Sequence, residues 1–393
     1  MVLISVVAIY FAWSYYSSGV EVEKQLVAIR QQGQPASLGE LARRPAVDSK
    51  LDAQTYLAEV DFDLQSLEAE LRPLTKNLHA QPILDEKTTA AIEQIFSHYP
   101  KVLQQLQLAS MCENYYSRAD FSRSPSEFLE SLYKDLPRLK SVGRVLTANV
   151  KVLIARGQFD QAAKQSLVIL RLAKHMDAEP TISAYGIAMA VRGLALSSLS
   201  DTMQSGPISA SVRLDIEKHL AADNLLLSFR AALISERAFG ISKHSQLPSL
   251  IQPTLLNEYL RCMELEIKNA ELSYSEIGQL KATPTERSGV AMMIELVKNA
   301  VELARESTHR TLAINRALRI LNAIQGDIAL KNAETIELSA LPLPADAIED
   351  PFSFNAMLVR KSGDNWIVYS VGRDGKDDEG EIANDKDLGT FRR

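Results

Sequence analysis

The chain has 393 residues, of which 46% are hydrophobic and 23% are charged, so it is not a disordered protein and can bury one large core or two ordinary ones. Its net charge of −6 and the absence of a long Lys/Arg run argue against a nucleic-acid partner. Only Cys112 and Cys262 are present, which excludes a disulfide framework. They either pair across the fold or are two small buried hydrophobic residues, and we favour the second reading.

The N-terminal segment, residues 1–19, contains no charged side chain, and Val2 to Trp13 is almost wholly apolar. A helix of about 20 residues at ~1.5 Å each spans roughly 30 Å, which matches the hydrocarbon core of a bilayer. We therefore expect residues 1–19 to form a membrane anchor. A cleaved signal peptide is the main alternative, but residues 1–19 lack the basic n-region of such a peptide. A buried core helix is the third option.

Residues 20–340 are predicted to form a large α-helical body, because apolar residues recur three and four positions apart through most of this range. No strand is expected before Leu341. Helices are expected at Val20–Gln32, Leu51–Leu78, Lys87–Cys112, from Ser124 onward, and at Thr181–Met203, Ser209–Phe239, Leu255–Leu280 and Glu286–Lys331.

The stretch from Leu146 to Met176 predicts a helical hairpin, in which Gly157 ends one helix and Asp160 lies near the start of the next. Its small residues beside Phe159 resemble a single tetratricopeptide-type repeat. No second copy follows at the expected period, so an ordinary helix pair is the favoured interpretation.

The last long helical pattern has apolar residues that step four, three, four, three, as a helix-packing seam requires. The residues of this seam are Val290, Ile294, Val297, Val301 and Ala304. A partner-binding coiled coil is one interpretation. A central core helix is the favoured one, because the seam loses its large apolar residues near Thr308.

Residues 341–393 are predicted to form a linker and a small β-tail. The prolines of Leu341–Ala345 favour an extended linker. The strand-like segments Ala356–Lys361 and Trp366–Val371 are separated by the turn-rich Ser362–Asn365, which indicates a β-hairpin.

An acidic loop follows the predicted hairpin. Residues 372–387 contain seven Asp or Glu and three Lys or Arg, which gives a local charge of −4. Such a loop offers the oxygen ligands that Ca²⁺ prefers, but Glu379 stands where an EF-hand that starts at Asp374 needs glycine. A solvated acidic loop is the alternative.

The tail resembles the C-terminal region of the major pseudopilin of type II secretion systems. The resemblance rests on Asp350-Pro351, on Tyr369–Gly375 and on Asp385–Leu388. It implies a small β-structure closed by a calcium-binding loop. The ligands that it implies are the Val371 carbonyl and the carboxylates of Asp374, Asp385 and Asp387.

The sequence carries no recognisable catalytic motif. The six histidines stand singly, and neither a phosphate-binding loop nor a G-x-S-x-G elbow is present. Anchor, helical body and tail together resemble an uncharacterised group of bacterial single-span proteins, which implies no mechanism. We therefore predict a membrane-anchored binding or scaffold protein of the bacterial envelope, with its body outside the cytoplasm and an envelope protein as partner.

Two other functions stay open on the sequence. The first is a pseudopilin-related component of a secretion or pilus assembly, although residues 1–20 lack the prepilin cleavage signature. The second is a hydrolase with a carboxylate site in the helical body, since the proximity of two carboxylates is a property of the fold.

Overall fold

The computed structural model describes residues 2–42, 48–75, 83–248, 252–280, 289–363, 365–381 and 386–390. The helices are α1 (Val2–Gln31), α2 (Leu38–Leu41), α3 (Ala53–Glu59), α4 (Asp61–Thr75), α5 (Glu86–His98), α6 (Pro100–Met111), α7 (Pro125–Ala155), α8 (Phe159–Met176), α9 (Ile182–Ser205), α10 (Ala210–Ala221), α11 (Leu225–His244), α12 (Gln252–Lys268), α13 (Tyr274–Gln279), α14 (Gly289–Gly326), α15 (Ile328–Asn332) and α16 (Ala345–Ile348). The strands are β1 (Leu358–Ser362), β2 (Asn365–Ser370) and β3 (Leu388–Gly389). The chain is thus mainly helical with one small antiparallel sheet, as the sequence predicts.

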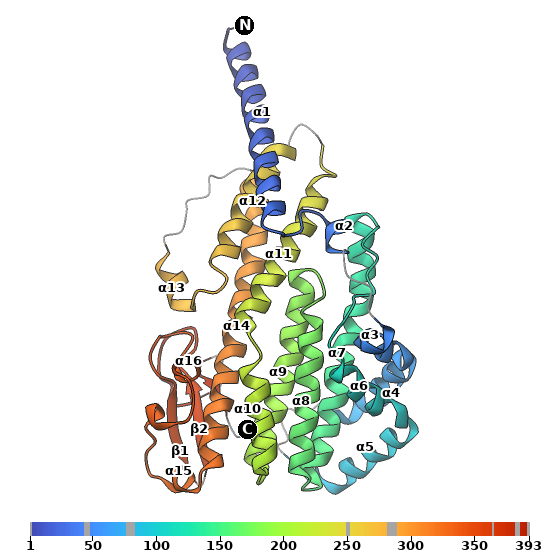
Figure 1. The fold of residues 1–393 in the computed structure, drawn as a ribbon, viewed down its shortest axis with the longest axis vertical. Helices are drawn as coiled ribbons and strands as arrows, with labels where there is room; N and C mark the ends of the chain where they lie inside the picture. The colour runs from blue at the N-terminus through green and yellow to red at the C-terminus, as the bar shows by residue number, and fades with distance from the viewer. Residues whose placement is uncertain are drawn as a thin grey trace.

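The core of the body is built around α9, which packs against α7, α8, α11 and α14. Figure 1 shows these helices running roughly along the long axis of the molecule. Among the residues that the structure describes, α9 is also the one helix long and apolar enough to cross a membrane. Because 61% of its apolar window is buried among the other helices, it serves here as a core helix.

The predicted hairpin is confirmed as the α7–α8 pair. Gly157 adopts φ +70°, which ends α7 at little steric cost, and α8 begins at Phe159. The start of α7 is also as expected. Ser124 and Glu127 form a capping box around Pro125, in which each side chain accepts a hydrogen bond from the other residue's backbone N–H.

Five segments predicted as continuous helices are interrupted. Leu51–Leu78 divides into α3 and α4, Lys87–Cys112 into α5 and α6, and Glu286–Lys331 into α14 and α15. At the two other breaks a polar cap is the cause. The segment Ser209–Phe239 breaks into α10 and α11 around Asp223, because the Asn224 side chain caps the Leu227 N–H at 3.1 Å. The segment Leu255–Leu280 breaks before α13, where Ser273 and Glu276 form a second capping box. In both places a polar capping residue overrides the surrounding apolar periodicity.

The seam helix α14 is a core helix of 38 residues. Ile294, Val301 and Ala304 are buried, and the apolar face continues beyond Thr308 with Leu318 and other residues of the main core. Helix α14 packs on α9 and α10 along one side and carries the sheet on another.

The predicted hairpin of the tail is confirmed as β1 and β2, paired in antiparallel register from Leu358↔Tyr369 to Ser362↔Asn365. A third strand, β3, was not expected and pairs with the end of β2. A side chain at Gly389 in β3 would collide with the Val368 carbonyl, so this pairing needs glycine. Strands β2 and β3 lie against α14, and Trp366 and Val368 belong to the same apolar core as the body helices.

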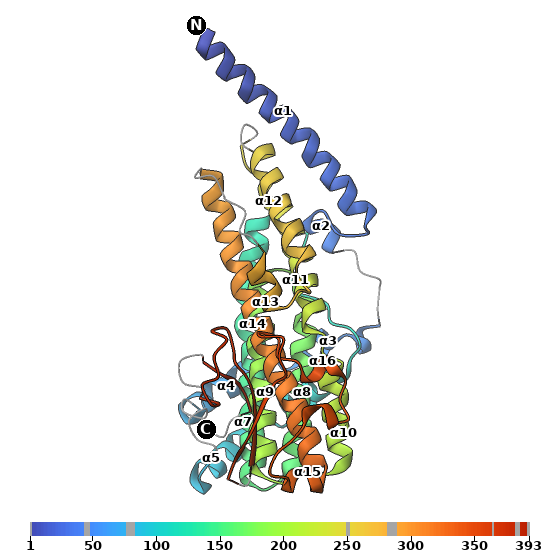
Figure 2. The same cartoon turned by 90° about the vertical axis from the view of Figure 1, so that its left-hand side faces the viewer.

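Helix α1 has two parts with different surroundings. Its C-terminal part packs on α12 through the buried Val22 and Ile29, and Gln25 Nε2 donates a 2.8 Å hydrogen bond to Asn257 Oδ1. Its N-terminal end projects away from the body, which both views show (Figures 1 and 2). The uncharged stretch of the sequence lies on this projecting end.

Neither cysteine is in a disulfide. Cys262 is buried on α12, whereas Cys112 is half-buried just after α6. The expectation of two unpaired, buried cysteines is confirmed for Cys262, whereas Cys112 is unpaired but only half-buried.

Candidate functional site

The predicted metal ligands that the structure describes differ in their position in the tail and in their exposure to solvent. Val371 lies at the end of β2, where its N–H donates to Asp350 Oδ2 at 3.0 Å. Asp374 lies in an exposed turn, where its Oδ1 accepts from the Lys376 N–H at 3.1 Å. Asp387 lies inside the loop and is fully buried. Asp385 is outside the described residues.

Asp387 closes the acidic loop from within. Its Oδ2 accepts from the N–H groups of Asp378 (3.1 Å) and Gly380 (2.7 Å), which draws residues 378–380 toward β3. Its Oδ1 and Asp378 Oδ2 are both buried, and neither has a hydrogen-bond partner among the residues of the loop that the structure describes. A buried unpaired oxygen costs about 1–3 kcal/mol, more if it is charged, so this loop has unused capacity to bind a positive group.

The electrostatics of the loop agree with this geometry. Burial, and after it the charges of Asp377 and Asp378, raise the pKa of Asp387 against the opposing hydrogen bonds from the Gly380 and Asp378 N–H groups. Burial and a hydrogen bond to Asp377 also raise the pKa of Tyr369 to about 12. Lys386 Nζ lies 3.3 Å from Asp378 Oδ1 and offsets part of the negative charge.

Asp350 is the fully bonded carboxylate of the tail. It is 1% exposed and accepts from the Phe352 N–H (2.8 Å), the Ser370 hydroxyl (2.7 Å) and the Val371 N–H (3.0 Å). The sequence singles out Asp350 only as part of the resemblance. In the structure it holds the end of β2, and therefore the start of the acidic loop, against the segment before β1.

Calcium would find carboxylate oxygens here, but in a set that differs from the one the resemblance implies. Asp387 and Asp378 each present a buried oxygen without a partner, which suits a hard cation. The Asp374 side chain, by contrast, is exposed and accepts a hydrogen bond from the Lys376 N–H. Within the described ranges, no three His, Cys, Asp or Glu side chains are arranged to hold a metal ion.

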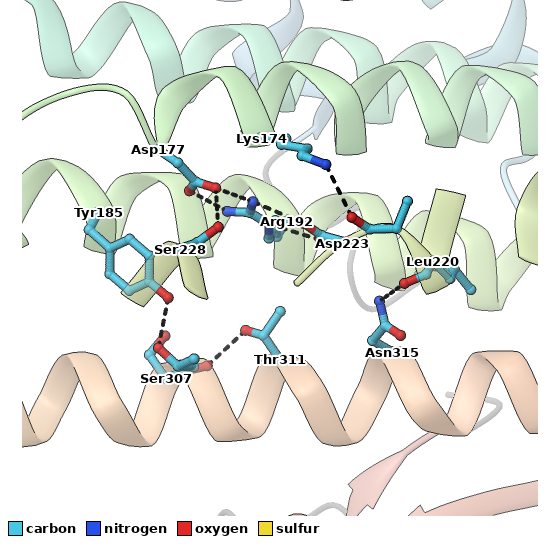
Figure 3. A network of polar contacts seen from close by, with 12 residues as sticks. Lys174, Asp177, Tyr185, Arg192, Leu220, Asp223, Ser228, Ser307, Thr311 and Asn315 are labelled. Atoms are coloured by element: carbon cyan, nitrogen blue, oxygen red, sulfur yellow. Dashed lines mark hydrogen bonds and ion pairs between the residues drawn. The ribbon is translucent and has the colours of Figure 1, made fainter. Parts of the chain in front are cut away.

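A second polar cluster, which the sequence did not predict, lies inside the helical body. The fully buried Arg192 of α9 donates to Asp177 Oδ1 at 2.7 Å and to Asp223 Oδ2 at 3.0 Å, and the Ser228 hydroxyl donates to Asp177 (Figure 3). Burial lowers the pKa of Arg192, but the two carboxylates outweigh this effect and raise it. The cluster joins the end of α8, the middle of α9 and the junction between α10 and α11.

Helix α14 is tied to this cluster's helices by several polar contacts. The hydroxyls of Tyr185 and Thr308 lie 2.8 Å apart, and Asn315 Nδ2 donates to the Leu220 carbonyl at 3.2 Å (Figure 3). These bonds fix α14 to α9 and α10. The cluster itself stays structural in character, because each of its charged groups is bonded to another member.

A pocket of about 520 Å³ opens beside this cluster, between the end of α6, α8 and α10. Asp223 lines the pocket on one side and bonds to Arg192 on the other. Cys112 also lines it, but burial and the charge of Asp52 raise the pKa of its thiol, which disfavours a nucleophilic thiolate. In the described part of the chain, no carboxylate of this pocket is hydrogen-bonded to a histidine.

Comparison of the chain with protein-family models, curated proteins and solved structures found no match. The residues above therefore carry the functional argument by themselves.

Proposed function

We propose that this chain is a membrane-anchored binding or scaffold protein of the bacterial envelope, with its helical body outside the cytoplasm and a calcium-stabilised tail. The observation that carries the proposal is the division of α1. Its uncharged end projects from the body, while its charged end docks on α12 (Figures 1 and 2).

The docking would fix the body relative to the bilayer. Besides the Gln25 bond, the Leu38 N–H donates to Ser242 Oγ at 2.8 Å, and Arg237 bonds to Gln34, so the chain after α1 is also held to α11. A continuous helix that is both embedded and packed cannot swivel freely. The body would therefore present one constant face to an envelope partner.

The experiment is a pair of charge substitutions on α1 in the full chain. Ile9→Arg places a charge in the uncharged stretch, where insertion at the bilayer centre costs about 2.5–3.5 kcal/mol. Glu23→Arg, on an exposed position of the docked part, is the matched control. We expect the parent and Glu23→Arg in the membrane fraction after alkaline extraction and a large part of Ile9→Arg in the soluble fraction. A parent protein that is released by alkaline extraction would contradict the anchor.

Calcium is proposed as the ion of the tail, held by Asp387 and Asp378, with the Val371 carbonyl and Asp385 supplied by the resemblance. When bound, it would supply the positive charge that the buried Asp387 lacks. We expect Ca²⁺ to raise the melting temperature of the parent and to have little effect on Asp387→Asn. Mg²⁺ is the control, because it demands a stricter octahedral set of ligands. An equal melting temperature with and without Ca²⁺ would remove the metal from the proposal.

The second candidate, a pseudopilin-related component of a secretion or pilus assembly, is favoured by the tail alone. In the tail, the hairpin of β1 and β2 comes first and the acidic loop follows it, which is the order that the resemblance implies. Site-directed crosslinking from the tail to secretion-machine subunits in intact cells would support it. Crosslinks from the helical body to another envelope protein would support the scaffold instead.

A further inference from the structure

The pocket between α6, α8 and α10 has a lining that the scaffold proposal does not use. Three cationic side chains line it: Arg171 and Lys174 from α8, and Lys218 from α10. The lining carboxylates are Glu113, which is exposed, and Asp223, which is only 3% exposed and already bonded to Arg192. The pocket is therefore positive overall.

Part of this positive charge has an ordinary structural explanation. Lysine and histidine are favourable in the last turn of a helix, where they offset the dipole and bond to free carbonyls. Lys174 does so by donating to the Ala222 carbonyl at 3.1 Å, and His219 Nδ1 lies 2.7 Å from the Asp215 carbonyl. These two residues alone would not indicate a ligand.

Arg171 and His175 are not explained in this way. They lie one turn apart on the same face of α8, and Arg171 Nε and His175 Nε2 are both buried with no hydrogen-bond partner among the residues that the structure describes. Arg171 Nη1 contacts His219 Nε2 at 3.2 Å and its Nη2 donates to Ser110 Oγ at 3.3 Å, so the guanidinium is held in place. Because an arginine only donates, His219 must accept through Nε2 and carry its proton on Nδ1.

The neighbouring carboxylates do not complete these bonds. Asp215 acts on Arg171 through charge alone, whereas His175 has a hydrogen bond to the Ala109 backbone besides the charge of Asp52. The buried Arg171 Nε–H is a donor that lacks an acceptor among the described residues, and such a group requires an explanation because unpaired buried donors are rare in folded proteins. An anionic oxygen group from outside the chain supplies both the acceptor and the compensating charge.

The remaining lining is apolar or aromatic. Leu170 and Ala178 line the pocket, and the ring of Tyr115 stacks on His175 with their centroids 6.3 Å apart. The volume of about 520 Å³ lies within the range of small-molecule sites. We propose that this pocket binds a small organic anion, with its carboxylate or phosphate group toward Arg171 and its apolar part against Leu170 and Tyr115.

The test is a titration of the full-length protein at low salt with hexanoate, with hexanol as the neutral analogue and inorganic phosphate as the anion without an apolar part. We expect hexanoate to bind at least about tenfold more tightly than either analogue, since both halves of the pocket then contribute. Equal binding of hexanol and hexanoate would overturn the anionic site. Binding of phosphate but not hexanoate would overturn the organic part of the proposal.

Single substitutions test whether hexanoate binds in this pocket. Arg171→Gln should weaken hexanoate binding about tenfold, because it removes both the positive charge and the unpaired Nε–H donor. Lys218→Gln, on an exposed side chain of the lining, should weaken it about threefold without disturbing the fold. Lys164→Gln is the matched control, an exposed lysine of α8 that does not line the pocket. If Lys218→Gln and Lys164→Gln behave alike, the anion binds elsewhere and the proposal fails.

Discussion

The helical body and the tail both bury carboxylates, but they treat the charge in opposite ways. In the body, Asp177 and Asp223 share one buried arginine, so two negative groups are bonded to a guanidinium that is also out of contact with water. In the tail, Asp387 is buried, and its side-chain partners among the described residues are two backbone N–H groups, while Asp377 and Asp378 add to the repulsion.

This difference indicates in which part of the molecule the buried charge is compensated by the chain itself. A buried charge is tolerated when an opposite charge and hydrogen bonds compensate it, and it is costly when they do not. The Arg192 cluster needs nothing from outside the chain. The acidic loop reaches a comparable state only if protonation or a cation removes the excess charge.

The largest change in stability is expected in the helical body, where the buried charges of the Arg192 cluster compensate one another. Arg192→Met leaves Asp177 and Asp223 buried without their partner, which should lower the free energy of unfolding by about 3–5 kcal/mol. Urea denaturation measures this. Arg144→Met, which breaks an exposed ion pair with Glu68, is the control and should cost less than about 1 kcal/mol. A loss for Arg192→Met no greater than for the control would mean that the cluster is not a fixed structural element.

Asp350→Ala tests the carboxylate of the tail whose bonds are complete. It leaves the Phe352 N–H, the Ser370 hydroxyl and the Val371 N–H without their acceptor, so we expect a loss of about 2–3 kcal/mol in urea denaturation. Asp346→Ala, an exposed aspartate on α16, is the control. Equal losses for the two variants would show that the Asp350 bonds do not stabilise the tail.

Asp387→Asn tests the uncompensated carboxylate and gives a pH dependence. Because the pKa of Asp387 is raised in the folded state, its charged form destabilises the fold above that pKa, and the penalty disappears as the pH falls through it. Without calcium, the variant should therefore gain stability over the parent as the pH rises from about 4 to 7, by less than about 1 kcal/mol, since Asn keeps an acceptor. A difference that is constant over this range would contradict the raised pKa.

Much of the helical architecture could be predicted from apolar periodicity, as the α7–α8 pair and the core role of α14 show. Periodicity missed the breaks within several predicted helices, for example the one at Asp223, because residues 209–239 remain helix-like across it. Asn224, which caps α11, was the one local signal. The Arg192 cluster depends on three segments meeting, and strand β3 has only two residues, so neither leaves a pattern in the sequence.

The smallest expected effect distinguishes the two ligand sets for the tail. The resemblance implies Asp374 as a ligand, whereas the structure places it in an exposed turn, bonded to the Lys376 N–H. Without calcium, Asp374→Ala should change the melting temperature little, because it removes one exposed hydrogen bond. With calcium, a retained rise in melting temperature would assign the ion to Asp387 and Asp378. Loss of that rise in Asp374→Ala would mean that the loop rearranges around the ion to bring Asp374 inward, as the resemblance implies.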